Sequence, residues 1–81
     1  RRAESERHQA AEALAASEET AYLRAAVARL PEGLREVVVL RLSAGLKFEE
    51  IAALLHVPLG TALSRMHAAV QSLKETLARQ P

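Results

Sequence analysis

Cysteine is absent from the 81-residue sequence, and Tyr22 and Phe48 are its only aromatic residues. Without cysteine the chain forms no disulfide and offers no thiolate to a metal ion, which fits a reducing compartment. No apolar run approaches the roughly 18 residues that span a bilayer, and Arg1 and Arg2 lead into polar residues rather than a secretion signal. These absences predict a cytoplasmic protein without a membrane segment. Because the first residue is not Met, we expect a piece of a longer protein.

Features that an enzyme or a metalloprotein needs are also scarce. The three glycines are isolated from one another, so the chain has no glycine-rich phosphate loop. The histidines, His8, His56 and His67, lack the spacing of four residues at which two side chains of one helix hold a metal ion. Short helices with an alanine-rich core leave little room for a desolvated catalytic pocket. The sequence therefore predicts no catalysis, no metal site and no cofactor.

Aliphatic residues at helical spacing are abundant. Apolar residues make up 49% of the chain, mostly Ala, Leu and Val, which suits packed helices better than an antiparallel sheet. Residues 1–16 are charged and alanine-rich and contain Leu14 as their one large apolar residue. We interpret them as a linker or a frayed helical extension, with a partner-binding arm as the alternative. Residues 17–81 are predicted to form one all-α domain.

Two helices are expected in the first half of this domain. Ser17 is a suitable N-cap for a helix over residues 18–30, and Pro31 ends that helix and opens a second one over residues 32–43. The run VVVL inside the second helix favours a strand, but no turn signal and no partner strand accompany it. Gly45 is predicted to stop the second helix in a left-handed conformation.

Two further helices complete the prediction. The third begins near Phe48, and its first turn should fray by ~1 kcal/mol because Lys47 is a poor N-cap. The stretch VPLG forms a turn, and a longer helix follows to Leu77. Two helices joined by so short a turn make a helix-turn-helix, here without a wing, which places its second helix in the DNA major groove. The expected core residues of the four helices are Leu23, Ala26, Val27, Leu30, Leu34, Val37, Val38, Leu42, Phe48, Ile51, Leu54, Leu55, Ala62, Met66, Ala69, Leu73 and Leu77.

The formal net charge of +1 is unevenly distributed along the chain. The last helix region holds Arg65, Lys74 and Arg79 against Glu75, so the basic excess lies where a DNA reader would have it. This excess is small beside the strong basic stripe of most nucleic-acid-binding domains.

Short motifs occur in a fixed order across the domain. They are LPE at 30–32, REV at 35–37, LR at 40–41, GL at 45–46, FEEIA at 48–52, VP at 57–58, GT at 60–61 and SRMH at 64–67. Over roughly residues 21–78 the sequence resembles region 4 of the extracytoplasmic-function sigma factors of bacterial RNA polymerase. The resemblance implies a four-helix module whose last two helices dock on the promoter −35 element. It also implies contact with the polymerase flap and an anti-sigma factor as a further partner.

The resemblance assigns DNA contacts to positions of this sequence. It implies base and phosphate contacts by Arg41, Ser64, Arg65 and His67 and by the turn residues Gly60 and Thr61, and the outward face of the last helix adds Leu63 and Lys74. For three of these residues the alternative is an interpretation without a role in DNA binding. Arg41 is a solvated residue at a helix end, Arg65 forms a weak surface ion pair with Glu49 or Glu50, and His67 is an ordinary surface histidine.

The sequence departs from the family pattern on the DNA-facing helix. Leu63, Ala68 and Val70 stand where basic residues are usual, and the loss of three charges should weaken DNA binding by orders of magnitude at physiological salt. Leu63 could instead read thymine methyl groups. Leu63 and Val70, seven residues apart with His67 between them, are either scattered surface residues or a partner-binding patch.

Three functional hypotheses follow. The first is −35 recognition and transcription initiation, as region 4 of an alternative sigma factor. The second is a sigma-like protein-interaction module that binds an anti-sigma factor or a second copy of itself and has weak or no autonomous DNA binding. The third is a generic DNA-binding domain from another regulator.

Overall fold

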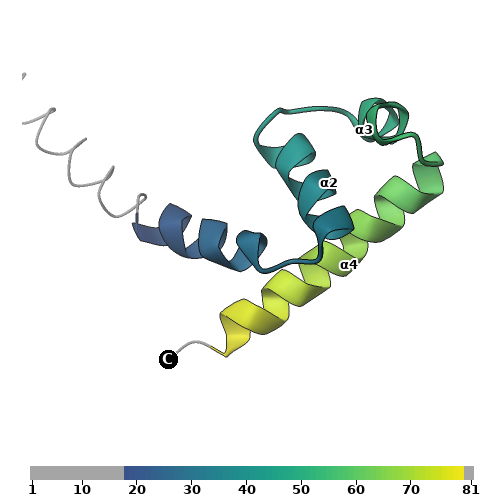
Figure 1. The fold of residues 1–81 in the computed structure, drawn as a ribbon. Coiled ribbons are helices and arrows are strands. Elements are labelled where there is room, and N and C mark those ends of the chain that lie inside the picture. The colour runs from purple at the N-terminus through teal and green to yellow at the C-terminus, as the bar shows by residue number, and fades with distance from the viewer. Residues whose placement is uncertain (1–17, 80–81) are drawn as a thin grey trace, which may run out of the picture.

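The computed structural model describes residues 18–79, which form helices joined by short loops (Figure 1). Helical residues 18–28 are followed by α2 (Glu32–Leu42), α3 (Phe48–Leu55) and α4 (Leu59–Ala78). Residues 18–79 contain no strand, so the predicted all-α fold is confirmed and the strand alternative for VVVL is wrong. The predictions for residues 1–16 and for Ser17 lie outside the described residues.

The loop after α2 ends that helix as the sequence predicts. Gly45 has a φ of 70°, a left-handed conformation that glycine adopts without steric cost. The backbone N–H of Leu46 then donates to the Leu40 carbonyl at 3.1 Å, which folds the chain back onto the end of the helix. The direction in which α3 leaves α2 is therefore set by this turn.

The start of α3 is better capped than Lys47 alone indicates. The Glu50 carboxylate accepts a hydrogen bond from the backbone N–H of Lys47 at 2.9 Å. This is one half of a capping box; a lysine side chain has no acceptor with which to supply the other half. The predicted fraying left out this contribution from Glu50.

The turn of the helix-turn-helix is shorter than predicted. His56 adopts a left-handed conformation with a φ of 57°, and the Val57 N–H donates to the Ala52 carbonyl at 3.0 Å, which closes the end of α3. Pro58 is the N-cap of α4, and its carbonyl accepts from the Thr61 N–H at 3.0 Å. Gly60 therefore lies in the first turn of α4 and not in the connecting turn.

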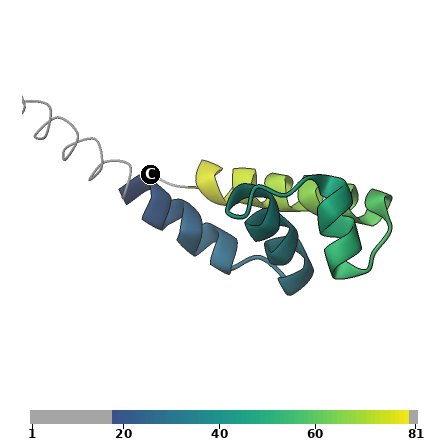
Figure 2. The same ribbon diagram turned by 90° about the horizontal axis from the view of Figure 1, so that it is seen from above.

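The core consists of two clusters that meet at Met66. Val37, Ile51 and Ala62 are fully buried where α2, α3 and the first half of α4 pack together. The second cluster joins residues 18–30, α2 and the middle of α4, and its buried members are Leu30, Val38 and Ala69. Figure 2 shows the consequence: segment 18–28 lies beside the C-terminal half of α4, whereas α3 lies at its N-terminal end.

Four leucines that were predicted to be buried are exposed. Leu23, Leu42, Leu54 and Leu77 keep 39%, 62%, 57% and 44% of their surface accessible to solvent. Helical spacing identifies an apolar stripe, but a few short helices do not cover the full width and length of every stripe. None of the helices in residues 18–79 is long and apolar enough to cross a membrane.

Candidate nucleic-acid interface

The first three turns of α4 present a continuous exposed face opposite the core. Ala62 and Ala69 are fully buried on one side of this helix. The exposed residues of the other side are Leu59, Gly60, Leu63, Ser64, His67, Ala68 and Gln71. We call these seven residues the α4 face. In a helix-turn-helix, this part of the second helix is the part that contacts base edges.

The α4 face has almost no formal charge. His67 is its one titratable residue. Lys74 is exposed about one turn after Gln71, the last residue of this face. Ala68 is exposed, but Val70 is half-buried. The predicted apolar pair therefore does not share one outward stripe: of its two members, Leu63 alone belongs to the exposed face.

Arg65 extends toward α2. Its guanidinium lies 3.6 Å from the position that a Cβ on Gly33 would occupy, and its side chain is half-buried. The guanidinium thus packs over the first turn of α2, next to the backbone of Gly33. In this conformation Arg65 packs α4 against α2.

Arg41 connects the end of α2 to the start of α3. Its Nη1 donates to the Leu46 carbonyl at 2.9 Å, and its guanidinium carbon lies 4.9 Å from the centre of the Phe48 ring. The side chain remains exposed, so the same group is accessible to a phosphate. Arg41 is thus a solvent-exposed residue at a helix end that also has two defined partners.

Two residues of the first turn of α4 differ in their surroundings. Thr61 is half-buried. Gly60 is exposed, and a Cβ added there would meet nothing within 4 Å. The packing of the domain therefore gives no reason for a glycine at this position. A glycine at this position would let another molecule approach the backbone of α4 closely.

The family is decided by comparison with known proteins. A family model described as "Sigma-70, region 4" matches residues 20–73. The chain belongs to the sigma-70 region 4 family. It is also 48% identical, over 57 residues, to the ECF RNA polymerase sigma factor SigE of Mycolicibacterium smegmatis (strain ATCC 700084 / mc(2)155). The aligned part is 70% of this chain and 22% of that relative, so the chain spans about a fifth of the length of that sigma factor. The resemblance to region 4 of the extracytoplasmic-function class is thus confirmed.

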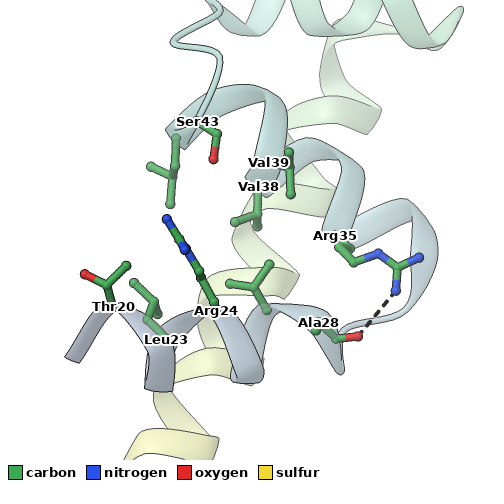
Figure 3. A pocket seen from close by; sticks show the side chains of 10 residues that line it. Thr20, Leu23, Arg24, Ala28, Arg35, Val38, Val39 and Ser43 are labelled. Carbon is green, nitrogen blue, oxygen red and sulfur yellow. Dashed lines mark hydrogen bonds between the residues drawn. The ribbon is translucent and has the colours of Figure 1, made fainter. Parts of the chain in front are cut away.

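A second surface of this region 4 domain was not predicted from the sequence. A groove of about 370 Å³ separates segment 18–28 from α2 on the side away from α4 (Figure 3). Its lining is mostly apolar and includes Leu23 and Leu42, two of the leucines that were expected in the core. The complete lining is Thr20, Leu23, Arg24, Val27, Ala28, Arg35, Val38, Val39, Leu42 and Ser43. We call it the α2 groove.

Two arginines lie at the edges of the α2 groove. Arg35 donates through Nη1 to the Ala28 carbonyl at 3.3 Å, the bond drawn in Figure 3, and so ties α2 to the end of segment 18–28. Arg24 is exposed on segment 18–28. The groove thus combines an apolar floor with positive charge at its rim. Elsewhere in residues 18–79, no three potential metal-ligating side chains lie close together.

Proposed function

We propose that this domain recognises the −35 element of a promoter, as the region 4 part of a cytoplasmic alternative sigma factor that acts in transcription initiation. The observation that carries the proposal is the α4 face, an exposed surface on the second helix of a helix-turn-helix in a sigma-70 region 4 chain. A helix of this kind fits the DNA major groove with its N-terminal residues on base edges. Gly60, Leu63, Ser64 and His67 would be the residues closest to the DNA.

The few basic residues outside the α4 face support a weak electrostatic contribution to DNA binding. Lys47 is exposed at the start of α3, Lys74 is exposed farther along α4, and Arg41 is exposed at the end of α2. About one counterion is released for each phosphate that a basic side chain neutralises, so two to four contacts give a salt slope of roughly −2 to −4. Tight promoter binding by such a domain would depend on a linked domain that is bound to the polymerase. The linkage raises the effective concentration of this domain at the promoter.

The α2 groove supports a role for the same domain in binding RNA polymerase. Its apolar floor, with Arg24 and Arg35 at the rim, fits an amphipathic helix that carries acidic residues beside an apolar stripe. We assign this groove to the flap of the polymerase. An anti-sigma factor that covers the groove would block that contact, which is how a protein-interaction role and a promoter role coexist on one domain.

A direct binding experiment tests the DNA proposal. The 81-residue chain is mixed with a pool of duplexes that carry a randomised centre, at low salt, and the enriched duplexes are titrated at several salt concentrations. We expect saturable binding with the slope given above. A chain that enriches no duplex at low salt contradicts DNA recognition and favours the interaction module. Leu63→Lys is the matched gain-of-charge variant, and it should steepen the slope by about one unit.

A further inference from the structure

Leu63 is the more exposed of the two leucines on the α4 face. It keeps 46% of its surface accessible, against 41% for Leu59, although the opposite side of the helix holds the fully buried Ala62 and Ala69. On the exposed side, Leu59 and Gly60 precede it by about one turn, Ser64 follows it directly, and His67 lies about one turn after it. The isobutyl group of Leu63 therefore remains accessible to another molecule, and it belongs to neither core cluster.

The chemistry of the α4 face limits which bases it can read. Guanine is most often read by Arg or Lys, and the exposed residues from 59 to 71 include neither. The major groove displays one apolar group, the 5-methyl of thymine, and an aliphatic side chain contacts it favourably. Ser64, His67 and Gln71 on the same face carry donors and acceptors that can form hydrogen bonds with adjacent base edges.

We propose that Leu63 is a specificity-determining residue that packs against the 5-methyl group of a thymine in the −35 element. This inference rests on the proposed DNA function and adds to it the base feature that is recognised. A protein partner for the same leucine is the competing occupant, and the experiment separates the two.

Uracil substitution tests the inference, because uracil differs from thymine only by the missing methyl group. Duplexes enriched from the randomised pool by the 81-residue chain are resynthesised with each thymine in turn replaced by uracil. Burial of one methyl group is expected to contribute roughly a fourfold difference in affinity. At one thymine or more, uracil should therefore weaken binding of the unaltered chain about fourfold.

Two leucine variants locate the effect. Leu63→Ala should bind the thymine and the uracil duplex equally well. Leu77→Ala is the matched control, because Leu77 is 44% exposed on the same helix but lies near its C-terminal end, and it should keep the fourfold preference. Thermal unfolding of both variants verifies that they remain folded.

The outcomes distinguish the inference from the proposed function. DNA binding that no uracil weakens, or a thymine preference that persists in Leu63→Ala, overturns the methyl contact and leaves the promoter role standing. If no duplex is enriched at all, both fail, and self-association of the chain that Leu63→Ala abolishes would assign this leucine to a protein contact.

Discussion

The guanidinium of Arg41 lies over the ring of Phe48, with 4.9 Å between the guanidinium carbon and the ring centre, while its Nη1 holds the Leu46 carbonyl. These two contacts fix the loop between α2 and α3 at both of its ends. The geometry makes Arg41 a positioning residue for the first helix of the helix-turn-helix, whether or not it also contacts a phosphate.

Arg41→Lys tests this positioning role. Lysine keeps the charge but lacks the planar group that stacks on Phe48 and bonds the carbonyl at the same time. We expect the free energy of unfolding in urea to fall by about 0.5–1 kcal/mol. Arg79→Lys, at an exposed position after α4, is the control and should change it by less than about 0.3 kcal/mol. Equal stability of the two variants would show that the stacking contributes nothing.

Gly60→Ala should raise the stability of the domain and lower its affinity for DNA. The new methyl group meets nothing within 4 Å, and alanine is the better helix former, so the free energy of unfolding should rise by up to about 1 kcal/mol. DNA affinity should fall, because the methyl group lies where the proposed interface needs close approach. Gly33→Ala is the matched control on α2, with its Cβ in ordinary contact with Arg65. It should raise stability and leave DNA affinity unchanged; if Gly60→Ala behaves in the same way, Gly60 is not at the interface.

Substitution of the two left-handed residues found within residues 18–79 should change stability in opposite directions. His56 has a φ of 57° and pays the steric cost of a Cβ there, so His56→Gly should raise the free energy of unfolding by about 1 kcal/mol. Gly45 has a φ of 70°, and Gly45→Ala should lower it by about the same amount. Thermal unfolding measures both, and a destabilised His56→Gly would mean that the histidine side chain has a structural role.

Leu42→Glu tests the assignment of the α2 groove. Leu42 is 62% exposed, so the substitution should change the free energy of unfolding by less than about 0.5 kcal/mol. A carboxylate on the apolar floor should weaken binding to core RNA polymerase at least about tenfold, because an acidic partner is repelled and the leucine contact is lost. DNA affinity should stay the same.

Leu77→Glu provides the control for the groove. Leu77 is an exposed leucine that does not line it. Polymerase binding that tolerates Leu42→Glu as well as it tolerates Leu77→Glu would mean that the polymerase docks elsewhere and would leave the groove to another protein.

The parts of the fold that local chemistry determines could be predicted from the sequence. The left-handed stop at Gly45 follows from glycine itself, and the burial of Ala62 and Ala69 follows from helical spacing. The α2 groove could not be predicted, because Leu23 and Leu42 have the same spacing as core residues. Only the way in which segment 18–28 diverges from α2 leaves them uncovered.

In the candidate DNA site, too, some features follow from the sequence and others depend on contacts between helices. Exposure of Leu63, Ser64 and His67 follows from their positions opposite the buried alanines of α4. The conformation of Arg65 could not be predicted, because it depends on packing against Gly33, on a different helix. Sequence spacing identifies which residues share a face, but a long flexible side chain reaches beyond its own face.

The proposed promoter role requires that the α4 face is the surface that contacts DNA. Backbone amide chemical shifts of the isotopically labelled chain, measured during titration with an enriched duplex, locate that surface. The largest shifts should fall on residues 59–68 and the turn before them, while Leu23, Val39 and Leu42 in the α2 groove stay unchanged. Shifts concentrated in the groove, with α4 unaffected, would contradict the proposed role.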